Sequence, residues 1–296
     1  MLLLGEISAL TAALLWAATS LVYASVSKKI GSVQVNINRM IFSIGWFVPT
    51  LMLFQIPLRL SRSQLVYLIL SSIVGIVFGD TFLFKAFERI GARLSMLIMA
   101  LAPAIGAVLA YLFLQETLSV WAVMGIGATL CGVALVVLER APETPGYVSV
   151  TKLGIFYALL GALGQGGGVV LAKKAFADGP LNGFVASFVR IGVAIVVMLP
   201  VFAASGHYTN PIKVFGRDKK LLAIMLVGSF FGTFLGITLS LLAVAYTKVG
   251  IASTLIATSP VLMLPMVRII QQEQLSWKAI MGAIIAVAGV GMLFML

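Results

Sequence analysis

Ten apolar runs divide this sequence almost from end to end, and each is about as long as a helix that crosses the hydrocarbon core of a bilayer. They lie near residues 3–27, 33–55, 64–87, 92–114, 118–138, 152–176, 183–204, 220–246, 250–271 and 276–296. The runs lack the alternation of barrel strands, and a backbone in lipid must satisfy its own hydrogen bonds. The sequence therefore predicts an all-α integral membrane protein with ten transmembrane helices.

The composition agrees with this prediction and excludes several classes of protein. Of the 296 residues, 61% are hydrophobic and 10% are charged, and the segments between the runs are too short to form a soluble domain. The lone Cys131 excludes an intrachain disulfide framework and is expected to be a small core residue. The net charge of +11 is spread over the membrane-edge connections, which indicates contact with the lipid surface and no nucleic-acid partner.

A short polar joint occurs twice, as QETLS at residues 115–119 and as QEQLS at residues 272–276. A shift of 157 residues aligns residues 115–133 with residues 272–290, and nine of these nineteen positions are identical. Chance would give about two identities in so apolar a composition. The same shift aligns Pro103 with Pro260, and slightly different shifts align Arg39 with Arg190, Gly75 with Gly228, and Gly79 with Gly232. The chain is therefore interpreted as a duplication, with a first five-helix repeat at 1–140, a linker at 141–151 and a second repeat at 152–296.

An odd number of crossings in each repeat has a geometric consequence. The second copy must begin on the opposite face of the membrane, so the two repeats are expected to be inverted about an axis in the membrane plane. Inverted repeats are the structural basis of alternating access in many secondary transporters. The plain alternative is that the duplication built only a larger bundle.

The joints and the last helices also resemble a known family. Each half ends in Pro, twelve residues, Glu, any residue and Leu, followed by a glycine-spaced helix, and the first half contains GDTFLFKAFERIGAR at residues 79–93. This combination resembles the EamA-type transporters of the drug/metabolite transporter superfamily over essentially the whole chain. The resemblance implies a central cavity within helices one to four and six to nine, with helices five and ten at the periphery. It also implies export or exchange of small metabolites, commonly amino acids, without ATP. The second half departs from the pattern because Thr233 stands opposite Asp80 and because it has an extra proline, Pro265.

Asp80 is the carboxylate predicted to lie deepest in the membrane. Insertion of a charged residue at a helix centre costs roughly 2.5 to 3.5 kcal/mol, so Asp80 must face a cavity or a partner. Desolvation can favour the protonated carboxyl, which would suit protons as a coupling ion or the binding of a cationic group. A structural hydrogen bond to a neighbouring helix is the alternative.

Further polar residues in the apolar runs are candidates for a substrate site. Arg39 and Arg190 lie near the starts of their helices and are expected to extend toward the interface as structural residues, with contact to an anionic substrate as the alternative. Asn38 adds polarity beside Arg39. The other candidates for lining a cavity are Trp16, Ser20, Tyr23, Gln165, Thr254 and Thr258, although packing is the alternative for each aromatic residue.

Prolines, glycines and the repeated joints are given structural roles. Pro103 and Pro260 are expected to kink helices four and nine, and the GQGGG at residues 164–168 is expected to bend or unwind helix six. Glycines seven residues apart in helices five and ten predict close helix packing. Glu116 and Glu273 are assigned to tight helical hairpins, in which the serines that follow, Ser119 and Ser276, cap the next helices.

The sequence as a whole predicts a secondary transporter for a small polar or amphipathic metabolite, such as an amino acid, in the inner (plasma) membrane of a prokaryote. A multidrug or lipid-linked-sugar carrier, or a sensor or scaffold without transport, is the alternative. No catalytic residues, cofactor or metal site are expected, because no nucleophile and base, paired carboxylates or ligand cluster can be identified. The expected partners are a small-molecule substrate and the lipid bilayer. Lys and Arg are more frequent after odd-numbered helices, which places the termini outside by the positive-inside rule, whereas the family resemblance implies cytosolic termini.

Overall fold

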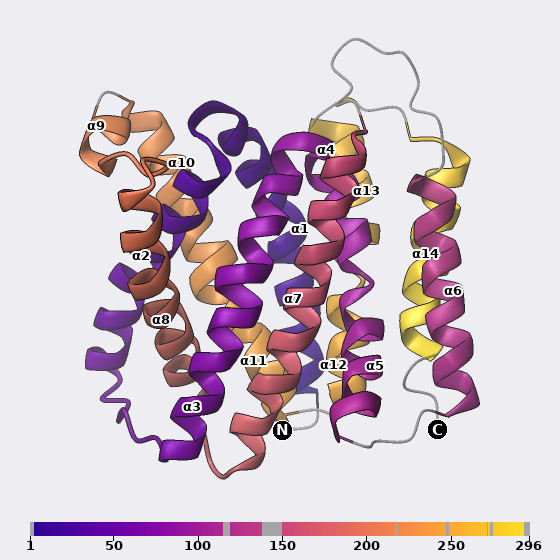
Figure 1. Ribbon diagram of the computed structural model, residues 1–296, viewed down its shortest axis with the longest axis horizontal. Helices are drawn as coiled ribbons and strands as arrows, with labels where there is room; N and C mark the ends of the chain where they lie inside the picture. The colour runs from indigo at the N-terminus through magenta and orange to yellow at the C-terminus, as the bar shows by residue number, and fades with distance from the viewer. Residues whose placement is uncertain are drawn as a thin grey trace.

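The computed structural model describes residues 3–114, 119–137, 150–216, 218–246, 249–270, 272 and 275–292, and these residues contain helices but no strands. The helices of the first half are α1 (Leu4–Ile30), α2 (Ser32–Leu53), α3 (Arg62–Ser71), η1 (Ser72–Asp80), α4 (Thr81–Met99), α5 (Ala102–Leu114) and α6 (Val120–Val137). Those of the second half are α7 (Lys152–Ala177), α8 (Gly183–Ala204), α9 (Pro211–Phe215), α10 (Lys219–Gly228), η2 (Ser229–Leu235), α11 (Gly236–Tyr246), α12 (Val249–Ile256), α13 (Ser259–Ile270) and α14 (Trp277–Met292). All ten apolar runs contain helix, and they stand side by side in one bundle (Figure 1).

Short polar motifs set where several helices begin. Ser61 and Gln64 form a capping box at the start of α3, and Thr151, Asn182 and Asp218 cap α7, α8 and α10. Ser119 and Ser276 accept hydrogen bonds from backbone N–H groups three residues later, at 3.1 and 3.0 Å, which confirms their predicted capping of α6 and α14. Glu116 and Glu273 lie outside the described residues.

Two stretches of π-helix occur where the sequence predicted plain helix. Segment η1 lies between α3 and α4, and η2 lies between α10 and α11, so each half carries one. A π-helical turn widens the backbone and is frequent at functional sites. The chain also turns at Gly91, whose φ of 73° divides α4 into two helical pieces. This turn coincides with the predicted boundary between the third and fourth apolar runs.

Breaks in the helices also occur just before Pro103 and Pro260. Residues 100–101 form a turn before α5, and residues 257–258 form a turn before α13. Because proline lacks a backbone N–H, it is tolerated in the first turn of the helix that follows such a break. Segment 164–168, in contrast, lies within the unbroken helix α7, so the expected unwinding of GQGGG is wrong. Its glycines are used for close helix packing, described below.

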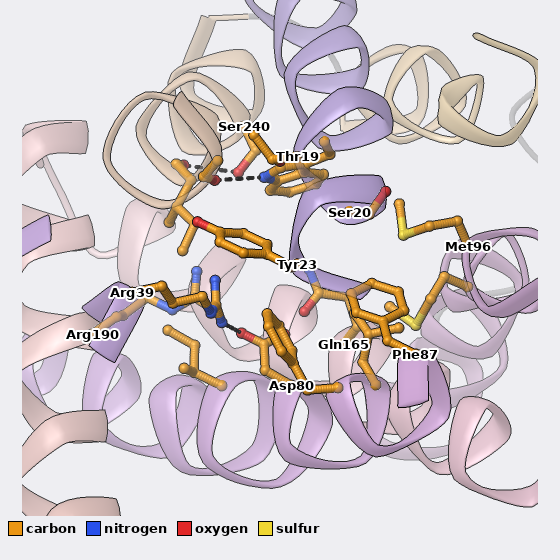
Figure 2. Close-up of a pocket in the computed structure, with 17 residues that line it drawn as sticks. Thr19, Ser20, Tyr23, Arg39, Asp80, Phe87, Met96, Gln165, Arg190 and Ser240 are labelled. Carbon is orange, nitrogen blue, oxygen red and sulfur yellow. Dashed lines mark hydrogen bonds and ion pairs between the residues drawn. The ribbon is translucent and has the colours of Figure 1, made fainter. Parts of the chain in front are cut away.

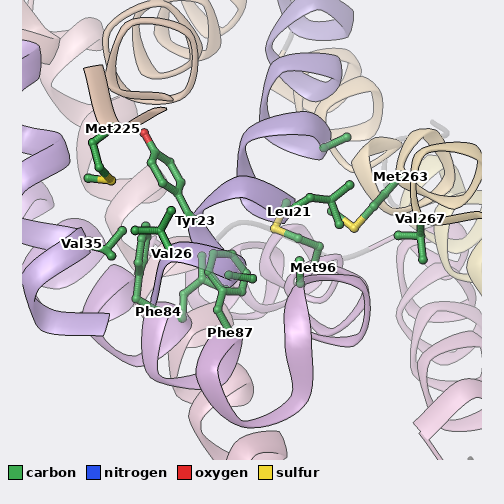
Figure 3. Packing of buried hydrophobic residues seen from close by; sticks show 14 of the residues in the cluster. Leu21, Tyr23, Val26, Val35, Phe84, Phe87, Met96, Met225, Met263 and Val267 are labelled. Carbon is green, nitrogen blue, oxygen red and sulfur yellow. The ribbon is translucent and has the colours of Figure 1, made fainter. Parts of the chain in front are cut away.

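Buried apolar residues from both halves form the core around the centre of the bundle. One cluster joins Tyr23 of α1, Phe84 and Phe87 of α4, Met225 of α10 and Met263 of α13 (Figure 3). Large apolar side chains elsewhere are strongly exposed, among them Val196 at 73% and Leu53 at 80%. Five helical stretches of the described chain are long and apolar enough to cross a membrane, namely Leu4–Ile30, Arg62–Met99, Lys152–Ala177, Gly183–Ala204 and Lys219–Tyr246. An apolar outer surface on such helices fits contact with lipid.

Helices α6 and α14 pack against each other at one edge of the bundle (Figure 1). A Cβ atom on Gly132 would lie within 2.6 Å of the Gly282 carbonyl oxygen, and one on Gly289 would lie within 2.8 Å of the Gly125 carbonyl oxygen. These contacts confirm the predicted close packing at the glycines. Cys131, in the same helix α6, is exposed, so its expected core role is wrong. Its neighbour Gly132 faces α14, and position 131 lies off that face.

A glycine pair in α6 allows a matched test of this packing. We expect Gly132→Ala to lower the free energy of unfolding by about 1–3 kcal/mol, because the added Cβ meets backbone atoms of α14 that have no room to shift. Gly127→Ala is the control, since a Cβ at position 127 has no atom within 4 Å. The control should be neutral or slightly stabilising, as alanine favours helix more than glycine. Thermal unfolding in detergent measures both, and equal effects would contradict the assigned packing.

Candidate functional site

A cavity lies between the two halves at the centre of the bundle, with about 700 Å³ of space between its atoms. Its walls come from α1, α2, η1, α4, α7, α8, η2 and α11 (Figure 2). Seven residues singled out from the sequence line it, namely Trp16, Ser20, Tyr23, Arg39, Asp80, Gln165 and Arg190. Concave sites with apolar walls and a few convergent polar groups are the usual form of small-molecule sites.

One end of the cavity is charged. Arg39 of α2 forms an ion pair with Asp80 at the end of η1, and the two side chains are 6% and 15% exposed. Arg190 of α8 lies beside them (Figure 2) and is 5% exposed. A charge with so little solvent exposure interacts strongly with its neighbours, because little water screens it.

Every part of the Arg39 guanidinium has a partner. Its Nε donates to Asn36 Oδ1 at 3.0 Å, its Nη1 donates to Thr233 Oγ1 at 3.3 Å, and its Nη2 donates to Asp80. Its Cζ atom also lies 4.7 Å from the centre of the Phe84 ring. These three acceptors and the face of the Phe84 ring compensate Arg39 for the hydration that it loses on burial.

Arg190 differs, although it occupies the matching position in the second half. Its Nε is buried without a hydrogen-bond partner, and its guanidinium has no ion pair or hydrogen bond within the described part of the chain. Its Nη2 lies near Gly75, where an added Cβ would come within 3.1 Å. The absence of a side chain at Gly75 therefore leaves room for the guanidinium.

Polar groups of α1 and η2 line another side of the cavity. Trp16 Nε1 donates to the carbonyl oxygen of Gly232 at 2.9 Å, and the hydroxyls of Tyr23 and Thr233 are 3.3 Å apart. Thr233 thus contacts both Tyr23 and Arg39. The sequence identified Thr233 only as the counterpart of Asp80, because nothing in its spacing indicates which helix it faces.

The remaining wall is largely apolar. Phe84 and Phe87 of α4 line it together with Met96 and Met99. Ser20 and Gln165 add neutral polar groups near this wall, whereas Ser240 lies beside Thr19 (Figure 2). These two phenylalanines and the two methionines were not predicted from the sequence. A signal was present, since residues 80, 84 and 87 follow the spacing that places side chains on one face of a helix.

Three of the predicted site residues are not seen to line this cavity. Asn38 donates to the Gln34 carbonyl oxygen at 2.7 Å and accepts from the Tyr208 hydroxyl at 3.0 Å, so it holds the segment before α9 against α2. Partial burial raises the pKa of Tyr208. Thr258 donates to the Leu255 carbonyl oxygen at 2.6 Å in the turn before α13. The side chain of Thr254 lies outside the described residues.

The expectation that Arg39 and Arg190 extend toward the membrane interface is wrong. Both are about 5% exposed and line the central cavity. Their positions along the helix indicated depth but gave no direction, and both side chains point inward, toward Asp80 (Figure 2). No group of three or more His, Cys, Asp or Glu residues that could hold a metal ion was found among the described residues.

The chain is similar to known transporters in sequence and to a solved structure in fold. The model described as the EamA-like transporter family matches residues 3–138 and 152–295. An uncharacterized transporter of Archaeoglobus fulgidus is 22% identical over 294 residues, which cover 99% of each chain. The uncharacterized transporter YxxF of Bacillus subtilis is 29% identical over 128 residues, which cover 42% of this chain and 39% of that protein. A solved crystal structure with 17% identity has the same fold, with a TM-score of 0.67 over 97% of this chain and 95% of the other.

Proposed function

This chain belongs to the EamA-like transporter family, and we propose that it is a secondary transporter, an exporter or exchanger, of a small polar or amphipathic metabolite. Membership of the family and the transporters similar to it indicate a multi-pass membrane transporter rather than an enzyme. The proposal adds the mechanism, which is alternating access between two inverted five-helix repeats at 1–140 and 152–296. The central cavity is the proposed substrate site.

The packing of α6 on α14 supports the inverted arrangement. Gly132 meets Gly282, and Gly125 meets Gly289. The shift of 157 residues converts each of these contacts into the other, as expected for two elements related by a two-fold axis. Residue numbers rise along one helix as they fall along the other, so the helices are antiparallel. A two-fold axis that relates antiparallel helices lies across them, and it lies in the membrane plane if they cross the bilayer.

A second pair of contacts supports the same axis. Gly75 and Gly79 in η1 pack on Gly168 and Gly164 of α7. Their counterparts Gly228 and Gly232 pack on Tyr23 and Thr19 of α1. Each half thus places its π-helical region against the first helix of the other half.

The lining of the cavity carries the proposal, because it is drawn from equivalent positions in both halves. Arg39 is matched by Arg190, and Ser20 by Gln165. In α4 and α11, Phe84 is matched by Ile237 and Phe87 by Ser240. A site to which two similar units both contribute can open to either side when the units exchange conformations.

Solute flux in proteoliposomes tests the proposed function. Purified protein should move a substrate across the sealed membrane unchanged and without ATP. A sensor or scaffold would give no flux above protein-free liposomes, and an enzyme would alter the solute chemically. A multidrug or lipid-linked-sugar carrier would instead move larger, more apolar compounds.

Side-specific labelling tests the inversion. Val120 and Trp277 occupy equivalent positions at the starts of α6 and α14 and are 75% and 72% exposed. In a Cys131→Ser background, we expect Val120→Cys and Trp277→Cys to react with a membrane-impermeant maleimide from opposite sides of sealed vesicles. Reaction of both from the same side would contradict an odd number of crossings between them and would overturn the inverted repeat.

A further inference from the structure

Arg190 is a buried cation whose side chain lacks a hydrogen-bond partner at Nε. This side chain lines the cavity and is 5% exposed. A buried charge that lacks a partner costs several kcal/mol, so such groups are normally paired. The matching Arg39, in contrast, donates hydrogen bonds to three side chains of the protein.

The charges that line the cavity do not balance. Arg39 and Arg190 contribute two positive charges, and Asp80 contributes one negative charge. Asp80 forms its ion pair with Arg39, and the nearby Arg190 is left without an ion pair or side-chain hydrogen bond among the described residues. The site therefore carries one positive charge in excess, on a guanidinium whose planar donors match a carboxylate.

The other residues that line the cavity indicate which groups a bound solute should carry besides an anion. Phe84, Phe87, Met96 and Met99 offer an apolar wall, and Ser20 and Gln165 offer neutral hydrogen-bonding groups near it (Figure 2). A solute that fits Arg190, the apolar wall and the neutral polar groups has one anionic group, an apolar body and few other polar atoms.

We infer that Arg190 binds the carboxylate of the transported solute and that the preferred solutes are small amphipathic monocarboxylates. This inference rests on the proposed transport function and narrows its substrate class. A zwitterionic amino acid fits less well, because its ammonium group requires an acceptor and Asp80 is held by Arg39. A monocarboxylate brings the charge of the site to zero, whereas a zwitterion leaves the excess charge in place.

A matched set of probes tests this preference on the purified, full-length protein in detergent. Acetate, butanoate and 3-phenylpropanoate are compared with their amides, with phenylalanine and with inorganic phosphate, at constant ionic strength set by chloride. We expect the carboxylates to raise the unfolding temperature more than their amides, with 3-phenylpropanoate the most effective and phenylalanine weaker. If no carboxylate exceeds its amide, or if phosphate or phenylalanine equals 3-phenylpropanoate, the inference is overturned.

Substitutions locate the effect at Arg190. Arg190→Gln should weaken 3-phenylpropanoate binding roughly tenfold or more, and Arg190→Lys should retain part of the affinity, because lysine keeps the charge without the planar fork. The control is Arg268→Gln, at an exposed position of α13, which should leave binding unchanged. Ligand-free Arg190→Gln should unfold at or above the temperature of the unsubstituted protein, since it removes an unpaired charge. A lower temperature would assign Arg190 a structural role and would also overturn the inference.

The two proposals fail separately. Carboxylate binding through Arg190 without flux in proteoliposomes would keep Arg190 as a carboxylate-binding residue and overturn the transport function. Flux of an uncharged or zwitterionic solute that is independent of Arg190 would do the reverse.

Discussion

Replacing Arg39 by Met is expected to lower the free energy of unfolding by about 3–5 kcal/mol, the usual cost of breaking one side of a buried ion pair. The substitution leaves the carboxylate of Asp80 without its partner and deprives Asn36 and Thr233 of a donor. Met fills a similar volume, so the loss reflects charge and hydrogen bonding more than a cavity. Thermal and denaturant-induced unfolding in detergent measure the effect.

Two further variants separate this explanation from general damage to the core. Arg39→Met combined with Asp80→Leu should recover most of the lost stability, because no unpaired charge from the pair remains. Arg190→Met, at the equivalent position, should cost much less, since Arg190 has no side-chain hydrogen bond or ion pair among the described residues and its Nε is buried without a partner. Equal losses of stability in Arg39→Met and Arg190→Met would contradict this explanation, because only Arg39 has an ion pair to lose.

The helices were predictable because the membrane leaves few alternatives. Apolar length and the capping serines Ser119 and Ser276 placed their boundaries close to those of the structure. The π-helical segments η1 and η2 were not predictable. The backbone of η1 touches glycines of α7, and that of η2 lies beside Trp16 and Thr19, so the local conformation depends on partners distant in sequence. The predicted unwinding at GQGGG was wrong for the same reason. Glycines disfavour helix on their own, but here their close packing on η1 stabilises it.

The candidate site was partly predictable because polar residues are costly in lipid. Asp80, Gln165 and Tyr23 were identified by their rarity in apolar runs, and they line the cavity. The pair formed by Arg39 and Asp80 was not identified, because position along a helix gives depth but no partner. Phe84 and Phe87 were missed because an aromatic residue in an apolar run more often packs in the core.

The proposed duplication, followed by divergence, accounts for the difference between the two arginines. Both repeats carry the arginine, at Arg39 and Arg190, but only the first carries the carboxylate, and Thr233 stands in its place in the second. Asp80 and Thr233 both bond to Arg39. The halves are therefore similar enough to form a shared cavity, while their difference leaves Arg190 available to a ligand.

Asp80→Asn should separate solute binding from transport if protons are the coupling ion. The charged groups that face Asp80 are Arg39 from α2 and Arg190 from α8, and Tyr23 faces it from α1. The ionised Asp80 lies near Arg190 and would repel a solute carboxylate bound there. Protonation of Asp80 should therefore favour solute binding, and by linkage solute binding should favour protonation.

Asparagine imitates the protonated carboxyl while still accepting a hydrogen bond from Arg39. We expect Asp80→Asn to bind 3-phenylpropanoate roughly tenfold more tightly, to lose the pH dependence of binding, and to transport roughly tenfold more slowly because release is impeded. Calorimetric titration across pH and flux in proteoliposomes measure the three effects. Asp178→Asn, at an exposed carboxylate after α7, is the matched control and should change none of them. Unchanged affinity together with an intact pH response would exclude Asp80 as the coupling group, and the positive charge of the cavity would then serve binding alone.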